Sequence, residues 1–242
     1  MVEKTVSKAI EYRRSVRRYD PTKPLKKEDV KSCIQQAILA PSSSNLQLWE
    51  FYHITQAKTL KEIAAACFGQ TAASTALQLV VTVVRKDLWK QRAASNINFI
   101  TKQFENQKVR NSKDEKKSMN YYKKVVPTIY SDFFGLLGGL KKVMAFVIGM
   151  FRPMYREVSS GDVRVIAQKS AALASQNFMI SMAALGYDTC PMEGFDSKRV
   201  KQILGLPKKA EINMIIGCGQ QAEGGIYGPR FRVPFEEVYR EV

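Results

Sequence analysis

The hydrophobic and polar positions along the chain follow two different periods, which mark helices and strands. In residues 27–40 the apolar side chains recur at helical spacing, which predicts an amphipathic helix. In residues 77–84 nearly every side chain is apolar and most are β-branched, which predicts a strand buried on both faces. Similar patterns predict helices at residues 5–13, 57–67, 162–185 and 197–204, and strands at residues 49–55, 187–190 and 211–218.

One stretch, residues 96–159, interrupts this order with polar, basic and helix-prone sequence. Between Arg85 and Glu157 the chain has sixteen basic residues and six acidic ones. We therefore predict a single domain over residues 1–242, with a basic helical insertion at about residues 96–159.

The most apolar part of this insertion, residues 133–151, has Lys141 and Lys142 in its middle. A lysine at the centre of a bilayer costs about 2.5–3.5 kcal/mol on insertion scales, so this run does not predict a membrane span. We expect an amphipathic helix or a helical hairpin that packs within a dimer, with contact to a membrane surface as the alternative.

The amino-acid composition disfavours several further classes of functional site. The 242 residues include four scattered cysteines, no CxxC pair and a single histidine, His53. These features disfavour zinc-ribbon and dithiol chemistry, fit a reducing compartment and leave little room for a histidine-based triad or metal site. His53 lies in a predicted strand, where we expect a structural role. Charged residues interrupt the first fifteen positions, which disfavours a signal peptide, so we expect a cytoplasmic protein without a metal.

The net charge of +16 is compatible with a nucleic-acid surface, but the chain has none of the recognition signatures of such proteins, and we expect no nucleic-acid partner. A tighter basic group lies near the N-terminus, where arginines crowd around Ser15 at positions 13, 14, 17 and 18. Guanidinium groups bind phosphate oxygens in a forked geometry, so this cluster predicts a phosphate receptor. Arg18 alternates away from Arg17 and is expected to be a surface charge.

A second motif suggests a nucleotide site that the following sequence does not support. Residues 217–222 match GxGxxA after a predicted strand, as in dinucleotide-binding turns. That function requires a following helix and a βαβ unit of about 30 residues. Only 20 residues follow Ala222, and they include Pro229 and Pro234, so the match does not indicate a nucleotide site.

Three separated segments, at residues 13–20, 40–49 and 190–195, together resemble the FMN-dependent nitroreductase family. They read RRSVRRYD, APSSSNLQLW and CPMEGF. The likeness continues in order through the alanine-rich helix that ends in Gly186-Tyr187 and the C-terminal segment at residues 229–238. Leu48 departs from it, because the family usually has proline there. The resemblance implies an α+β fold with a mixed, mostly antiparallel central sheet flanked by helices, in an intertwined homodimer.

The resemblance also implies a site for FMN. The residues expected around its phosphate are Arg13, Arg14, Ser15, Arg17, Arg230 and Arg232. The residues expected around its ring and ribityl chain are Pro41, Ser42 and Asn45, usually from the partner subunit, together with Gln70 and the turn Pro191, Met192, Glu193 and Gly194. A backbone N–H of Glu193 or Gly194 is expected beside flavin N5, which accepts and donates the hydride.

The implied activity needs no catalytic side chain, because the cofactor performs the redox chemistry. NADH or NADPH passes hydride to flavin N5 and leaves, and a small acceptor such as a nitroaromatic or a quinone then takes two electrons in a ping-pong mechanism. Two alternatives remain open. One is another flavin reaction of the same family, such as dehalogenation, flavin fragmentation or dehydrogenation. The other is a non-enzymatic flavin-binding or membrane-surface protein that uses residues 102–151 on anionic lipid.

Overall fold

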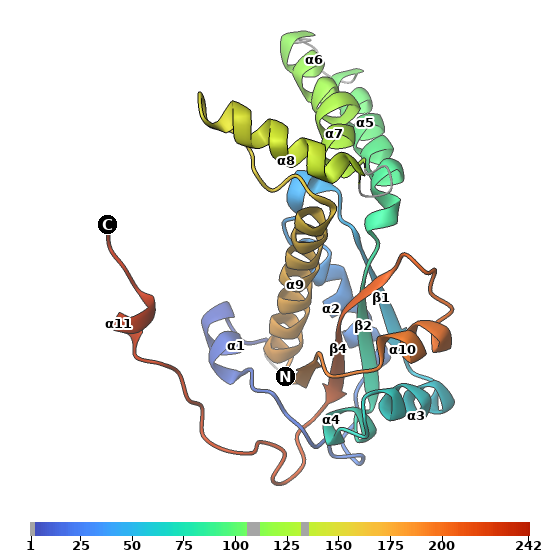
Figure 1. Cartoon of the computed structure of the whole chain (residues 1–242). Helices are drawn as coiled ribbons and strands as arrows, with labels where there is room; N and C mark the ends of the chain where they lie inside the picture. The colour runs from blue at the N-terminus through green and yellow to red at the C-terminus, as the bar shows by residue number, and fades with distance from the viewer. Residues whose placement is uncertain (1–2, 106–111, 132–135) are drawn as a thin grey trace.

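A computed structural model describes residues 3–105, 112–131 and 136–242 of the chain (Figure 1). The strands are β1 (Trp49–Ile54), β2 (Gln78–Val84), β3 (Asp188–Met192) and β4 (Glu211–Gly219). The helices around them are α1 (Val6–Tyr12), α2 (Lys27–Ala37), α3 (Ala57–Ala66), α4 (Thr71–Ser74), α9 (Ser160–Ala184), α10 (Ser197–Ile203) and α11 (Phe235–Val238). The basic region forms α5 (Trp89–Glu105), α6 (Ser112–Asn120), α7 (Val126–Tyr130) and α8 (Leu136–Gly149).

The four strands form one sheet in the order β1-β2-β4-β3, with every neighbouring pair antiparallel. An isolated parallel bridge joins Ser15 to Thr189 at the β3 edge. The expected α+β fold with a mixed, mostly antiparallel sheet flanked by helices is confirmed.

Helices cover both faces of the sheet, which explains the apolar run in β2. Val81 faces α3 and α10 and packs in a cluster with Ile63 and Val200. Its neighbour Val80 faces α2 and α9 and packs with Val30 and Phe178. All seven residues of β2 are buried, and the hydroxyl of Thr82 is satisfied there by Ser175 Oγ at 2.9 Å. Alternate residues of one strand therefore supply two cores.

The long helix α9 begins two residues before the predicted start at residue 162 and ends one residue before the predicted end at residue 185. Ser159 and Asp162 form a capping box at its start, in which each side chain accepts a hydrogen bond from the other residue's backbone N–H. Gly186 follows its C-terminus with φ of 82°, a left-handed conformation that glycine adopts at little cost. Alanines along α9 let α1 and α2 approach closely.

Some predicted boundaries differ from the observed ones, as in the helix expected over residues 27–40, which ends at Ala37. The strand expected to end at residue 190 continues to Met192, so Pro191 and Met192 belong to β3 rather than to a turn. Proline is tolerated there because β3 lies at the edge of the sheet, where one side of the backbone has no ladder partner to lose.

The structure gives the GxGxxA segment a packing role. A Cβ atom at Gly217 would lie 2.6 Å from the carbonyl oxygen of Ala72, and one at Gly219 would lie 2.7 Å from the ring of Tyr19. Tyr19 is buried and its hydroxyl donates to the Gly217 carbonyl at 2.8 Å. The two glycines therefore let Tyr19 and α4 lie directly on β4.

Helices α5 to α8 lie together at one end of the molecule, beyond the sheet (Figure 1). Residues 106–111 and 132–135 of the expected insertion, which include the start of the apolar run at residues 133–151, lie outside the described residues. Among the residues that are described, no helix is long and apolar enough to cross a bilayer. The division into one domain and an insertion stays a prediction.

Candidate functional site

Arginines from the two ends of the chain line one cavity of about 320 Å³. Its walls combine residues after α1 with the C-terminal segment that follows β4. They are Arg13, Arg14, Ser15, Arg17, Ile226, Tyr227, Gly228, Pro229, Arg230, Phe231 and Arg232. Six of the residues predicted to bind a phosphate are therefore brought together by the fold.

Hydrogen bonds to backbone carbonyls hold the two walls against each other. Arg230 Nη2 donates to the carbonyl oxygens of Glu11 and Arg13, at 2.8 and 2.7 Å. In return, Arg14 Nη2 donates to the Gly228 carbonyl at 2.6 Å. These bonds fix the C-terminal segment beside the N-terminal one. Arg230 and Arg14 therefore have a structural role in addition to any contact with a ligand.

Ser15 and Arg17 are positioned by their backbones. The bridge to Thr189 includes a hydrogen bond from the Val16 N–H to the Thr189 carbonyl at 3.1 Å. The N–H of Arg17 donates to Gly225 at 2.7 Å, and its guanidinium lies 5.2 Å from the ring centre of Tyr227. The sequence predictions did not include Tyr227; the glycines before it, at 224 and 225, were the available sign of a close chain crossing.

The electrostatics of the cavity favour an anion. Among the described residues, no carboxylate lies within 4.0 Å of the five arginines that line it, so none of them is neutralised by an ion pair. Burial, followed by the nearby charges of Arg230 and Arg232, lowers the pKa of Arg13. A group of like charges held together without counterions is suited to a phosphate.

A second group of predicted residues lies at the end of β3. Gln70, at the start of α4, donates from Nε2 to the Gly194 carbonyl at 2.5 Å and to the Cys67 carbonyl at 3.0 Å. The amide of Gln70 thus lies directly beside the segment formed by residues 191–194. Cys190 is buried nearby, and burial raises the pKa of its thiol, so it remains protonated and serves as a packing residue.

The third predicted group, Pro41, Ser42 and Asn45, lies in the loop that leads into β1. Ser42 Oγ accepts a hydrogen bond from the Gln47 N–H at 3.1 Å. Asn45 Nδ2 donates to Asn96 Oδ1 at 3.0 Å, which ties the loop to α5. Asn45 itself has φ of 48°, a conformation that asparagine tolerates better than most residues.

One chain does not bring all three groups together. The loop with Ser42 and Asn45 enters β1, whereas residues 191–194 lie in and after β3, at the opposite edge of the sheet. Three strand spacings separate these edges, about 14 Å. The groups also lie at different heights along the strands. Ser15 forms a bridge with Thr189, which is level with Gln78 at the start of β2, whereas Trp49, where the Ser42 loop enters β1, pairs with Val84 at the end of β2.

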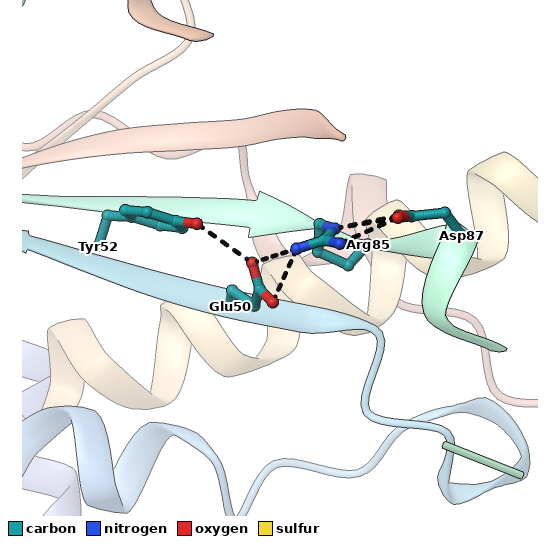
Figure 2. Close-up of polar contacts among 4 residues, drawn as sticks. All are labelled: Glu50, Tyr52, Arg85 and Asp87. Carbon is teal, nitrogen blue, oxygen red and sulfur yellow. Dashed lines mark hydrogen bonds and ion pairs between the residues drawn. The ribbon is translucent and has the colours of Figure 1, made fainter. Parts of the chain in front are cut away.

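A polar network that the sequence analysis missed anchors that far end of the sheet (Figure 2). Arg85 Nη1 donates to both carboxylate oxygens of Glu50 at 2.8 Å, and its Nη2 donates to Asp87 at 3.0 Å. Tyr52 donates to the same Glu50 carboxylate at 3.4 Å. The partners come from β1 and from the residues just after β2, so no motif in the sequence joins them. The network fixes the place where the Ser42 loop enters the sheet.

We expect Arg85→Ala to lower the free energy of unfolding by about 1–3 kcal/mol at neutral pH, because it strands two partly buried carboxylates. Hydrogen bonds from Arg85 hold the pKa of Asp87 below its ordinary value. That stabilisation is present above the unfolded pKa of about 3.9 and is lost as the pH falls through the lower folded value. The deficit of the variant should therefore shrink in acid, as measured by urea unfolding across pH.

Arg199→Ala is the matched control, since its pair with Asp196 is exposed and such pairs contribute little. A loss for Arg85→Ala that equals the control at neutral pH, or that does not change in acid, would contradict the role given to the network.

A search for related families matched residues 10–220 to the model described as the nitroreductase family. The chain belongs to the nitroreductase family. The resemblance inferred from the sequence motifs is thereby confirmed, and the cavity and the β3 segment occur within a nitroreductase fold.

The similarity of this nitroreductase family member to individual proteins extends over most of the chain. Protein DrgA of Synechocystis is 29% identical, over 89% of this chain and 83% of the relative. A protein named NADH dehydrogenase from Thermus thermophilus is 26% identical, over 93% of this chain and 90% of the relative. A protein of Exiguobacterium sibiricum, solved in complex with FMN, has a TM-score of 0.65 at 19% identity, with 100% of this chain and 99% of that chain covered.

Proposed function

We propose that this chain is an FMN-dependent oxidoreductase that takes electrons from NADH or NADPH and reduces a nitroaromatic, a quinone or a similar small acceptor. The observation that carries the proposal is the cavity where arginines from both ends of the chain meet without a carboxylate partner among the described residues. The FMN bound to the Exiguobacterium sibiricum protein and the name of the Thermus thermophilus relative support the choice of cofactor and of a nicotinamide donor.

The residues present fit FMN at its charged end. Its phosphate carries close to two negative charges at neutral pH, and the cavity offers the unpaired guanidinium groups of Arg13 and Arg17 with the hydroxyl of Ser15. Arg232 would add charge from the C-terminal segment, while Arg230 holds that segment in place through the Arg13 carbonyl.

The residues at the end of β3 fit the ring. Gln70 lies beside Gly194 and would present its amide to the polar edge of the ring, with the backbone N–H groups of Glu193 and Gly194 as further donors. When bound, FMN supplies a ring that accepts a hydride from the donor and passes two electrons to the acceptor. The protein's part is then to bind, to orient and to exclude water. Cys190 is buried and Pro191 has no N–H, so neither offers an acid or a base there.

We further propose that the active form is a homodimer. Ser42 and Asn45 approach a ring held near Gly194 only if a second copy supplies them, because within one chain the two groups lie at opposite edges of the sheet. The C-terminal segment also exposes large apolar side chains, which a second copy would cover. They are Phe231, Val233, Phe235, Val238 and Tyr239.

The test is direct. The purified chain should take up FMN with a flavin absorbance spectrum, and NADH or NADPH should bleach that spectrum under anaerobic conditions. Adding a nitroaromatic or a quinone should restore it, and steady-state rates should follow ping-pong kinetics. A protein that binds no FMN would overturn the proposal. Bleached protein that reoxidises only with a halogenated substrate would favour dehalogenation, and oxidised protein that is bleached by a saturated ring substrate without NADH or NADPH would favour dehydrogenation.

A further inference from the structure

Helix α8 exposes most of its described large apolar side chains to solvent, which reverses the usual arrangement of a surface helix. Leu140, Val143, Met144 and Val147 recur at three- and four-residue spacing and share one face. All four are exposed, as are Phe146 beside them and the following Met150 and Phe151, the last at 83%. Ala145, which is 2% exposed, lies on the opposite side of the helix. Among the described side chains of the helix, those that point outward are therefore mostly large and apolar, and Ala145 is the buried one.

The same segment is uniformly basic. Residues 136–156 contain four basic residues and no aspartate or glutamate. Lys142, Arg152 and Arg156 are exposed, and Arg156 Nη2 donates to the Gly149 carbonyl at 3.1 Å, at the C-terminal end of the helix. Further exposed lysines lie on the neighbouring helices at this end of the molecule (Figure 1). They are Lys116, Lys117, Lys123 and Lys124.

We propose that α8 docks on the surface of an anionic lipid bilayer, with its apolar face in the interface and its basic residues against the lipid headgroups. A helix with one apolar face and nearby cationic side chains binds such surfaces in the plane of the membrane. The length of α8, 14 residues, corresponds to about 21 Å, which is shorter than the hydrocarbon core of about 30 Å. The helix therefore lies on the bilayer and does not cross it.

Charge complementarity favours lipid over the α8 helix of a second copy of this chain. Pairing α8 with α8 would bring together the basic residues of both copies without any acidic residue from either helix. An anionic leaflet instead attracts each lysine or arginine near its surface, with a gain of about five-fold in affinity per residue. Of the two alternatives stated for this run, the basic residues around its apolar face therefore favour the membrane surface.

The experiment is co-sedimentation of the full chain with vesicles of phosphatidylcholine alone and of phosphatidylcholine with phosphatidylglycerol. Wild-type protein should sediment with the anionic vesicles and remain in solution with the neutral ones. Phe151→Asp and Phe146→Asp should each weaken this binding at least ten-fold, and Lys142→Glu should weaken it at least five-fold. Phe68→Asp and Lys58→Glu are the matched controls, because both residues are exposed on or beside α3 and should leave binding unchanged.

Three outcomes would count against docking of α8 on lipid. Wild-type protein that stays in solution with anionic vesicles would overturn it. Binding that disappears in Lys142→Glu but persists in both phenylalanine variants would indicate charge attraction alone and would also overturn it. A change of molecular mass in Phe151→Asp without lipid would identify the face as an interface between copies. Flavin absorbance of each variant reports folding, so a loss of binding with intact absorbance belongs to the surface and not to the fold.

Discussion

Arg13→Ala should weaken FMN binding about 10- to 100-fold, because hydrogen bonds to charged groups contribute about 1.5–3 kcal/mol. Arg13 lines the cavity, and its guanidinium has no carboxylate partner in the part of the chain that the structure describes. Its backbone carbonyl, which accepts from Arg230, is retained in the variant. Arg17→Ala should behave in the same way. Titration of apoprotein with FMN, followed by quenching of flavin fluorescence, measures both losses.

The same substitution should not destabilise the apoprotein. Burial, followed by the charges of Arg230 and Arg232, lowers the pKa of Arg13, so these surroundings oppose its charge in the folded chain. Removing it should leave the thermal midpoint of the apoprotein unchanged or slightly raised, as at other sites where binding groups oppose stability.

Arg18→Ala is the matched control. Arg18 is adjacent, exposed and outside the cavity, and its backbone carbonyl still accepts from the Ala222 N–H. It should change FMN affinity by less than two-fold. Equal losses for Arg13→Ala and Arg18→Ala would show that the N-terminal cluster acts only as a diffuse surface charge.

Much of the fold could be predicted from the sequence because its signals are local. The period of residues 27–40, the apolar run of β2 and the capping box of α9 each arise within one segment, and the structure has elements at these places. The end of β3 could not be predicted in this way. Proline usually ends a strand, and only the position of β3 at the sheet edge makes Pro191 acceptable.

The site was predictable where family motifs mark it and not where distant segments meet. The arginines at 13–17 and 230–232 were expected together, and they line one cavity. Tyr227 joins them through a chain crossing, and Arg85 joins Glu50 across strands. The two glycines before Tyr227 are the one local sign of its contact, and the Arg85–Glu50 pair has no signal in the local sequence.

The second large effect concerns the C-terminal segment, which runs away from the body of the chain to α11 (Figure 1). Phe235 in α11 is 64% exposed and stacks on Tyr239 at 4.8 Å. Within one chain, Phe235→Asp should therefore cost little. In a two-fold dimer the change occurs twice, and a central interface residue costs about 2 kcal/mol or more. The dissociation constant of the dimer should rise about 1000-fold.

Loss of the dimer should release the flavin, because a monomer lacks the Ser42 and Asn45 that a second copy would supply. Sedimentation velocity with detection at the flavin absorbance band measures the oligomeric state and the bound flavin in one sample. Phe68→Asp, at a side chain that is 72% exposed, is the control and should keep both the dimer and its flavin. Phe235→Asp protein that sediments as a monomer with full FMN occupancy would refute a shared site, because all groups that hold the cofactor would then belong to one chain.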